Sequence, residues 1–397
     1  MTATVLVLNC GSSSIKYRLV DTGNGTATTQ GLLERIGESG GRLRHEDPDG
    51  VREIDVDVPD HERGLREIMR AFDETGRPLA ESGLVAVGHR VVHGGDRFAD
   101  PVVVDDDVEA TIEALTPLAP LHNPPNLAGI QVARRALPDL PHVAVFDTAF
   151  HQSLPASAYT YALDTSTAAE HGVRRYGFHG TSVSYVSHEA ARLLERRLED
   201  TNLIVLHLGN GASATAVRGG RSVDTSMGLT PLEGLVMGTR SGDLDPGILF
   251  HLRREAGMAV DDLDDLLNRR SGLLGLAGAN DMREVHRRAR EGDEHALLAR
   301  EVYCHRIRHY VGAYLAVLGH AHAVVFTAGI GENDAWVRSH SLSGLRRLGI
   351  EVDHVRNALP GRRAHVISPD GAEVAVMVVP TDEELEIARQ AISLVAT

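Results

Sequence analysis

A β-hairpin pattern that occurs twice constrains the fold of this 397-residue chain more than any other feature. Over residues 4–19, a short apolar run, a turn rich in glycine and serine at 9–14, and an alternating segment predict two strands joined as a hairpin. The same order of features returns over residues 203–217. We interpret the repeat as an internal duplication. The alternative is a chance similarity between two Gly/Ser turns.

Each hairpin is followed by apolar runs that alternate with amphipathic segments. Such alternation predicts an α/β protein. Without a low-complexity linker, we expect a first domain over 1–150 and a second over 151–380, with a soft boundary. The pattern leaves open whether a C-terminal helix over 381–397 packs on the second domain or returns to the first. The expected strands are 85–92, 142–146, 323–326 and 375–379, and the expected helices are 65–73, 106–115, 184–198, 261–268 and 294–318.

The charge balance and the cysteine count argue against several classes of protein. The chain has 40 basic and 55 acidic residues and a net charge of −15. Nucleic-acid binding needs a basic surface that replaces the counterions of the phosphates. No apolar run reaches the ~20 residues that span a bilayer, and the N-terminus lacks the basic region of a signal peptide. Because two cysteines also fit a reducing compartment, we expect a cytoplasmic protein that binds neither nucleic acid nor membrane.

Three loops that follow apolar strands are candidates for phosphate binding, at residues 9–16, 207–211 and 327–333. Backbone N–H groups of small residues in such turns can approach an anion. None is a P-loop, and the Rossmann pattern fails because Asp334 occupies its last glycine position. Each loop alone is more often an ordinary turn, but three in a duplicated chain favour nucleotide phosphates. The first contains Lys16, the only lysine in the chain, by chance or because a compact ammonium group is needed there.

Charged side chains also occur where an ordinary surface or core would not require them. Arg90 lies in a valine-rich strand, where an unpaired guanidinium is costly, so it must meet an anion. Arg240 is flanked by glycines, and His179 precedes a helix. Asp147 follows a strand, which is where α/β sheets place ligands. The alternatives are a structural ion pair for Arg90, a surface position for Arg240 and a structural role for His179. Glu383 lies in the acidic first turn of the expected C-terminal helix, where helix capping is the alternative to a functional role.

None of these residues belongs to a hydrolase motif. The sequence has no Gly-x-Ser-x-Gly, no His-Glu-x-x-His and no cysteine in a nucleophilic Cys/His setting. The remaining combination is one of phosphate-binding loops, cationic side chains and a few carboxylates. Phosphoryl transfer requires such a set, because it depends on positioning, a metal ion and neutralisation of charge.

Taken together, these motifs resemble the acetate kinase family (acetokinases). The resemblance implies the acetate and sugar kinase/heat-shock 70/actin fold, with two duplicated α/β domains around a central nucleotide cleft. It also implies a homodimer, Mg²⁺ (or Mn²⁺), and reversible transfer of the γ-phosphoryl group of ATP to acetate, giving acetyl phosphate and ADP. The matching stretches span almost the whole chain in the family's order: 9–16, 88–95, 146–151, 176–182, 207–213, 224–243, 329–333 and 381–385.

Carried over position by position, the resemblance implies roles for individual residues. The catalytic residues would be Arg90, Asp147, His179 and Arg240, and the ligands of Mg²⁺ would be Asn9 and Glu383. The acetate pocket would consist of Arg90, Val92, Leu121, His122, Phe178 and Pro231. The nucleotide would contact Lys16, His207, Leu208, Gly209, Asn210, Gly211, Asp281, Met282, Arg283, Gly329, Ile330, Gly331, Glu332 and Asn333.

The ionisation of acetate bears on the role that the resemblance implies for Asp147. Acetate is already ionised at pH 7, because carboxylic acids of this kind have a pKa near ~4. No base is needed, so we expect Asp147 to orient Arg90, Arg240 or the metal rather than to remove a proton. The obstacle is repulsion between two anions, which Arg90, Arg240, His179 and Mg²⁺ would counter.

Other functions fit the same motifs less well. Propionate or another short-chain carboxylate is the nearest alternative, because one methylene discriminates by only ~1–3 kcal/mol. A sugar kinase needs a base for a hydroxyl group, whereas Arg90 and Arg240 suit an anion. An ATP-driven binding module like the heat-shock 70 nucleotide domain would need a peptide-binding segment, and an actin-like filament protein has no use for the Arg/His set.

Overall fold

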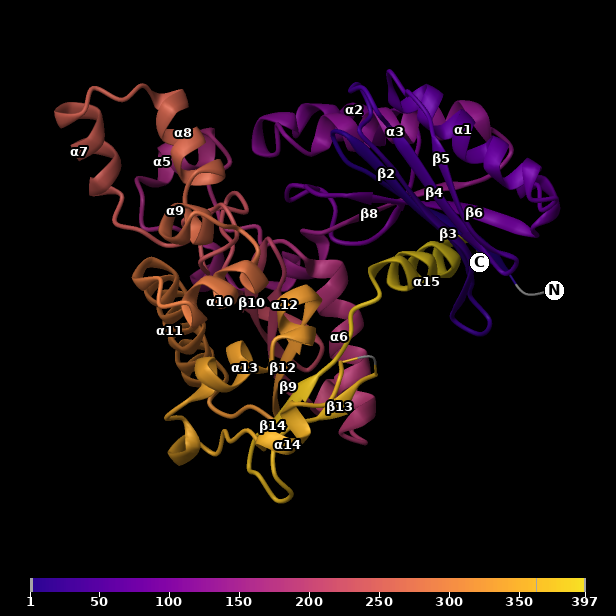
Figure 1. Cartoon of the computed structure of the whole chain (residues 1–397). Coiled ribbons are helices and arrows are strands. Elements are labelled where there is room, and N and C mark those ends of the chain that lie inside the picture. Colours follow the sequence, from indigo (N-terminus) through magenta and orange to yellow (C-terminus); the bar gives the residue numbers. More distant parts are fainter. Residues whose placement is uncertain (1–2, 362, 396–397) are drawn as a thin grey trace. The chain divides into compact units, whose positions relative to one another are not determined.

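The computed structural model describes residues 3–361 and 363–395, so the last two residues of the predicted segment 381–397 lie outside the described part. The chain forms two compact units (Figure 1). Unit 1 consists of Met1–Phe150 together with Asp382–Thr397, and unit 2 consists of His151–Thr381. The chain therefore leaves unit 1 once and returns to it through its C-terminal helix.

Unit 1 is built on an eight-stranded sheet with the order β5-β4-β3-β2-β1-β6-β8-β7. β1 and β2 form the first hairpin, and β6 and then β8 continue the sheet in parallel to β1. The strands are β1 (Thr4–Cys10), β2 (Ser14–Asp21), β3 (Thr26–Glu34), β4 (Arg42–Asp47), β5 (Gly50–Asp55), β6 (Leu84–Val91), β7 (Val102–Val103) and β8 (His142–Phe146).

Unit 2 repeats this arrangement in a six-stranded sheet with the order β11-β10-β9-β12-β14-β13. β9 and β10 form the second hairpin, and β12 and β14 continue in parallel to β9 as β6 and β8 do to β1. The predicted duplicated α/β fold is therefore confirmed. The strands are β9 (Asn202–Leu208), β10 (Ala212–Arg218), β11 (Arg221–Thr225), β12 (Ala323–Thr327), β13 (His365–Val366) and β14 (Ala375–Val378).

Helices cover both faces of the sheet in unit 1, where Figure 1 shows α15 on the side opposite α1 and α3. The alternation along β6 agrees, because Val87 belongs to the core under α1 and α3, whereas a side chain on Gly88 would meet Ile387 of α15 at 2.8 Å. The helices of unit 1 are α1 (His61–Glu74), α2 (Asp106–Ala114), α3 (Asn123–Ala136) and α15 (Glu383–Val395).

Unit 2 carries most of the helices. The long α11 matches its predicted bounds. In the described residues, no helix has the length and apolar character needed to cross a membrane. The helices of unit 2 are α4 (Ala156–Tyr159), α5 (Thr165–Glu170), α6 (Gly180–Leu193), α7 (Gly247–Glu255), α8 (Val260–Arg269), α9 (Gly272–Ala277), α10 (Met282–Arg290), α11 (Glu294–Leu318), α12 (Ala328–Asn333), α13 (Ala335–Leu342) and α14 (His354–Asn357).

Two local predictions are wrong. The helix expected over 184–198 begins at Gly180 and ends at Leu193, because Glu195 takes a left-handed backbone with φ of 53°. The loop expected at 327–333 is the short helix α12, which begins directly after β12. Its glycines resemble a turn in the sequence, but Asn333 holds the helical turn by donating a side-chain hydrogen bond to the Gly329 carbonyl at 2.9 Å.

Two buried histidines lie side by side on β6 and β8. Nε2 of His89 is 2.9 Å from Nδ1 of His142, and Nε2 of His142 is 3.1 Å from the Leu137 carbonyl. Burial, followed by the neighbouring His142, places the pKa of His89 well below its usual value. Burial also lowers the pKa of His142, which Arg134 lowers further while the Leu137 carbonyl and Glu109 oppose the shift. Both rings are therefore neutral in the folded protein near pH 7.

This histidine pair predicts that acid destabilises the protein. Because both pKa values are lower in the folded state than when unfolded, the unfolded state takes up more protons below about pH 6.5. We expect the free energy of unfolding to fall there by up to about 1.4 kcal/mol per pH unit for each histidine that stays neutral. In His89→Gln, whose amide can still donate to His142, the fall should be shallower. Urea unfolding from neutral pH down to about pH 5 measures both slopes, and equal slopes would contradict this account.

Candidate functional site

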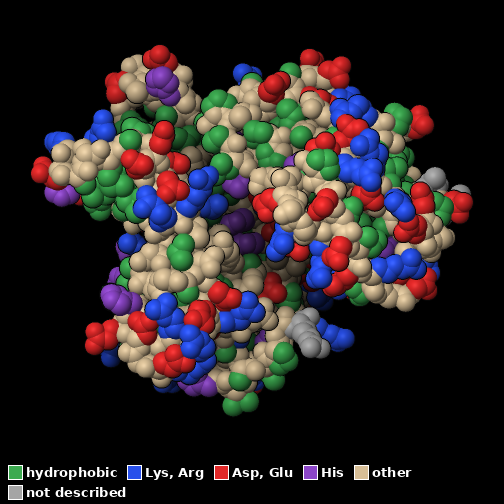
Figure 2. Space-filling model, turned by 45° about the horizontal axis from the view of Figure 1, so that its top comes forward, with side chains coloured by type: hydrophobic (Ala, Val, Ile, Leu, Met, Phe, Trp, Pro, Cys, Tyr) green, Lys and Arg blue, Asp and Glu red, His purple; other side chains and the backbone are tan. Residues whose placement is uncertain are grey.

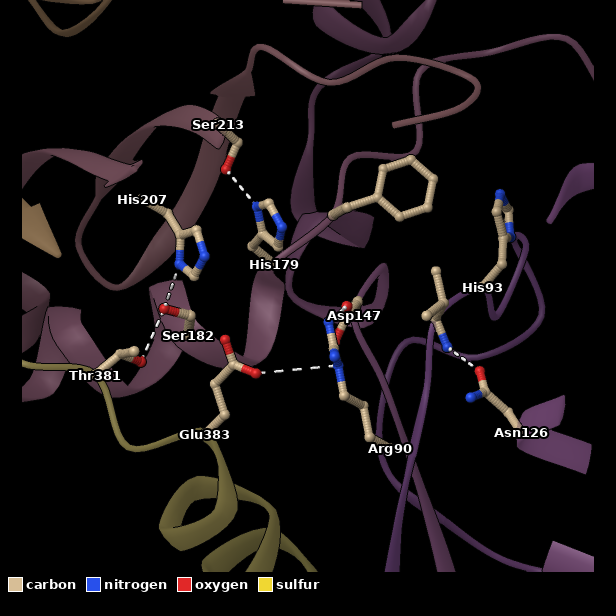
Figure 3. A network of polar contacts seen from close by, with 12 residues as sticks. Arg90, His93, Asn126, Asp147, His179, Ser182, His207, Ser213, Thr381 and Glu383 are labelled. Atoms are coloured by element: carbon tan, nitrogen blue, oxygen red, sulfur yellow. Dashed lines mark hydrogen bonds and ion pairs between the residues drawn. The ribbon is translucent and has the colours of Figure 1, made fainter. Parts of the chain in front are cut away.

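An arginine held by two carboxylates forms the centre of the candidate site in unit 1. Arg90 lies near the carboxyl end of β6, and Asp147 directly follows the neighbouring parallel strand β8. Nε and Nη2 of Arg90 donate to the two oxygens of Asp147 at 3.1 and 2.7 Å, and an oxygen of Glu383 lies 4.0 Å from Nε (Figure 3). Asp147 is buried, and the Arg90 side chain is 21% exposed. Arg90 is thus one of the three partners that the sequence analysis allowed for Asp147.

The first turn of α15 adds further charges to this cluster. Glu384 pairs with Lys16 and Asp382 pairs with Arg18, both of which lie on β2. Burial raises the pKa of Glu383, although Arg90 opposes this shift. Burial also acts on Glu384, but Lys16 and Arg18 outweigh it and lower the pKa of that carboxyl. Of the two adjacent carboxylates, Glu383 is the one whose negative charge would gain more from an added cation.

A stack of two histidines, His179 directly before α6 and His207 on β9, forms part of the candidate site in unit 2. The rings of His179 and His207 lie 4.0 Å apart at an angle of 18°. Nδ1 of His179 is 3.0 Å from the hydroxyl of Ser213, and Nδ1 of His207 is 2.8 Å from that of Ser182 (Figure 3). His179 has a left-handed backbone with φ of 58°, a conformation that a residue other than glycine adopts at a cost of about 1 kcal/mol or more. Such local strain is common at functional sites.

Arg240 approaches the same place from the loop before α7. A Cβ atom added at Gly211 would lie 3.6 Å from Nη1 of Arg240 and 3.6 Å from Nε2 of His179. Nη1 of Arg240 also donates to the Pro231 carbonyl at 3.3 Å. Burial lowers the pKa of Arg240, which nevertheless stays cationic because a free guanidinium titrates above ~12. The fold thus brings His179, Arg240 and Gly211 together.

A cavity of about 610 Å³ in unit 2 has the size of a small-molecule site. Three segments that are distant in the sequence form its wall: the turn after β9, the start of α10 and the helix α12. Ten residues line it, namely Gly209, Asn210, Asn280, Asp281, Met282, Arg283, Gly329, Ile330, Asn333 and Asp334. Eight of them are residues for which the resemblance implied nucleotide binding. Asn280 and Asp334 were not proposed from the sequence, although each adjoins a proposed segment.

Other residues implied for the nucleotide are not among those that line this cavity. Leu208 is fully buried in β9, and Gly331 is buried in α12. Glu332 accepts hydrogen bonds from the backbone N–H groups of Ala328 and Thr381, at 2.9 and 3.1 Å. Burial raises the pKa of Glu332, partly offset by these two bonds. These contacts give Glu332 a structural role in fixing α12.

The residues implied for the acetate pocket are divided between the units. In unit 1, the Val92 N–H donates to the side chain of Asn126 at 3.0 Å, His122 directly precedes α3, and Leu121 is 51% exposed. In unit 2, Phe178 is buried, and Pro231 is partly exposed beside Arg240. Asn9, an implied metal ligand, pairs with Lys16 in the β1–β2 ladder.

The wall of the cavity offers a test that avoids every charged residue. A Cβ atom at Gly238 would lie 1.9 Å from the side-chain oxygen of Asn210, which must then turn away. Because the resemblance implies that ATP occupies this cavity, we expect Gly238→Ala to raise KM for ATP several-fold while leaving KM for acetate nearly unchanged. Gly312→Ala on α11 is the matched control, because nothing lies within 4 Å of its added Cβ. Steady-state kinetics with each substrate varied in turn measures both constants, and an unchanged KM for ATP would contradict the placement of the nucleotide.

Basic and acidic side chains are interspersed over the face of the molecule that Figure 2 shows. Two duplicated α/β units, a cavity of nucleotide size beside a histidine and arginine pair, and an arginine–carboxylate cluster are together characteristic of the phosphotransferases with a duplicated fold.

Comparison with known proteins identifies the family. The model of the acetokinase family matches residues 4–389, and the chain belongs to this family. It is 61% identical to an acetate kinase of Clavibacter michiganensis subsp. michiganensis, covering 99% of both chains. Among solved structures, it resembles the acetate kinase of Porphyromonas gingivalis (42% identity, TM-score 0.94, 99% of both chains). It also resembles a propionate kinase of Francisella tularensis subsp. tularensis (41% identity, TM-score 0.93, 98% of this chain and 99% of the other).

Proposed function

We propose that the protein catalyses reversible transfer of the γ-phosphoryl group of ATP to acetate, giving acetyl phosphate and ADP. Membership of the acetokinase family and the names of the most similar relatives support this reaction. The structural observation that carries it is Arg90, a partly buried guanidinium that is fixed from one side by Asp147.

Unit 1 binds the anion that accepts the phosphoryl group. The contacts with Asp147 engage Nε and Nη2 of Arg90, so that Nη1 is directed away from Asp147 and available to a carboxylate or phosphoryl oxygen. Because acetate is already ionised, Asp147 orients Arg90 and removes no proton. The small side chain of Val92 forms a wall beside the methyl group.

Unit 2 binds the nucleotide and stabilises the charge that develops during transfer. The nucleotide occupies the cavity formed by Asn210, Asp281–Arg283 and α12. His179 and Arg240, which meet at Gly211, donate hydrogen bonds to the transferred group. Positioning and charge neutralisation of this kind account for most of the catalysis in phosphoryl transfer.

A magnesium ion fits the chemistry of the donor atoms present. In residues 3–361 and 363–395, no group of three or more His, Cys, Asp or Glu side chains is arranged to hold a metal. Mg²⁺ in nucleotide enzymes is usually held by one or two carboxylates together with phosphates and water. Asn9 and Glu383 would supply two oxygen ligands, and the raised pKa of Glu383 reflects a buried charge that a cation would stabilise. When bound, the ion neutralises phosphate charge.

We infer that the protein is a cytoplasmic homodimer. Helix α7 has no buried residue, and it exposes Ile248 and Phe250, the latter at 62%. The two cysteines, Cys10 and Cys304, are buried thiols that suit a reducing compartment. Sedimentation velocity of the wild type and of Phe250→Asp tests the dimer, with Val355→Asp, at a position that is 80% exposed, as the control.

The reaction is tested by trapping the acyl phosphate with hydroxylamine. Purified protein is incubated with ATP, Mg²⁺ or Mn²⁺, and a panel of carboxylic acids. We expect acyl hydroxamate from acetate and none without a divalent cation. The similarity to a propionate kinase makes propionate the second candidate substrate. The ratio of kcat/KM among acetate, propionate and butyrate decides between them, and failure to form any hydroxamate would refute the proposed function.

A further inference from the structure

A histidine on α10 contacts an aspartate that lines the cavity of unit 2, and none of the roles given above uses this contact. Nε2 of His286 lies 2.7 Å from Oδ2 of Asp334. The two side chains are only 14% and 15% exposed, so water competes little for this bond. Because an ionised carboxylate can only accept, Nε2 of His286 carries the hydrogen and donates it to Asp334.

Asp334 connects three helices. Its Oδ1 accepts from the backbone N–H of Val337 at 2.9 Å and thereby caps the start of α13. Its own backbone N–H donates at 2.9 Å to the carbonyl of Ile330 in α12, and Ile330 lines the cavity. Through Oδ2 and His286, Asp334 is also joined to α10. The aspartate therefore couples the position of α12 to that of α10.

His286 lies on the face of α10 that contributes to the opposite side of the cavity wall. The helix begins at Met282, which is buried and lines the cavity. His286 follows Met282 by four residues, which places the two side chains on the same face of the helix. Met282 of α10 and Ile330 of α12 both line the cavity. The bond between His286 and Asp334 therefore joins two separate parts of its wall.

The fold of unit 2 does not depend on this bond alone. Both α10 and α13 also pack against the long helix α11. The alternative role for the pair is stability, although a single ion pair that water can reach often contributes little to it. Since α11 holds both helices, loss of the bond should let the wall of the cavity move while unit 2 stays folded.

We propose that His286 is a positioning residue for the nucleotide, because its bond to Asp334 fixes α10 relative to α12 and so sets the width of the cavity. His286 is not among the ten residues that line the cavity, so it acts through those that do. The inference rests on the proposed function, in which the nucleotide occupies this cavity. Its first consequence is an effect on the binding of ADP, which can be measured without turnover.

Two amide variants test whether the donor at Nε2 of His286 is what matters. In His286→Gln the side-chain nitrogen reaches about as far as Nε2 and can still donate to Asp334, whereas the shorter side chain of His286→Asn cannot. Isothermal titration calorimetry with ADP and Mg²⁺, in the absence of acetyl phosphate, measures the dissociation constant. We expect His286→Asn to bind ADP about five- to tenfold more weakly than the wild type, and His286→Gln to stay within about twofold of it.

The chain offers a matched control and a built-in check of folding. His305→Asn makes the same change at an exposed histidine in the middle of α11, and it should leave ADP binding unchanged. Trp336 is the only tryptophan in the chain, and its ring meets that of His286 edge-on with the centroids 5.1 Å apart. Thermal unfolding followed by the fluorescence of Trp336 therefore shows whether each variant is folded around this contact.

Kinetics supplies the second readout. In His286→Asn, KM for ATP should rise by about the same factor as the dissociation constant of ADP, with kcat and KM for acetate nearly unchanged. A loss of stability alone would not divide the constants in this way. Equal ADP affinity in His286→Asn and the wild type, or equal weakening in the two amide variants, would overturn the inference. A wild type with the expected order of ADP affinities that forms no acyl hydroxamate would instead refute the proposed function alone.

Discussion

Replacing Arg90 by lysine is expected to lower kcat for acetate phosphorylation by about 10²- to 10³-fold, as loss of one preorganised donor does at other sites of charge stabilisation. Lysine keeps the charge but lacks the planar guanidinium group. Arg90 uses this group to donate to Asp147 from Nε and Nη2 while Nη1 is directed elsewhere. Water cannot fully replace the lost hydrogen bonds, because the Arg90 side chain is only 21% exposed. Initial rates of hydroxamate formation, with acetate and ATP varied separately, measure the effect.

Two companion variants make the result on Arg90 specific. Asp147→Asn should retain more activity than Arg90→Lys, because an amide oxygen still accepts one hydrogen bond from the guanidinium. Arg63→Lys on α1 is the control for the substitution itself, since Arg63 is exposed and pairs with Glu67 one turn further along the same helix. Turnover of Arg90→Lys close to that of the wild type would exclude Arg90 from the reaction. A larger loss in Asp147→Asn than in Arg90→Lys would exclude a purely orienting role for Asp147.

The parts of the fold that the sequence predicts are those whose side chains are buried on a regular pattern. β1 and β9 are recognisable because nearly every residue in them is apolar and buried. The expected elements did not include β3, β4 and β5, and β5 is almost wholly exposed, so an apolar pattern is missing. The C-terminal helix shows the limit of local patterns, since only the three-dimensional structure returns α15 to unit 1.

The residues of the candidate site also differ in how easily they are recognised in the sequence. Arg90 and Arg240 are conspicuous in the sequence because a cation among valines or glycines is unusual there. Ser182 and Thr381 give no such signal, since isolated hydroxyl groups are common and these two are 199 residues apart before folding brings them into contact. Glu332 shows a further limit, because its motif gives no sign that its carboxylate accepts hydrogen bonds from the backbone N–H groups of Ala328 and Thr381.

Arg240→Lys is expected to lower kcat by about 10²-fold or more while KM for ATP changes little, because Arg240 acts on charge that appears only during transfer. The backbone of Arg240 is closely packed, because its carbonyl accepts a hydrogen bond from the Met237 N–H at 3.2 Å and a Cβ atom at Gly272 would lie 2.7 Å from the same oxygen. We therefore expect the substitution to remove the planar guanidinium group without moving the loop. Arg218→Lys, an exposed arginine that donates to the Val317 carbonyl, is the control. If Arg240→Lys turned over at nearly the wild-type rate, stabilisation of the transferred group would have to come from His179 and the remaining cations.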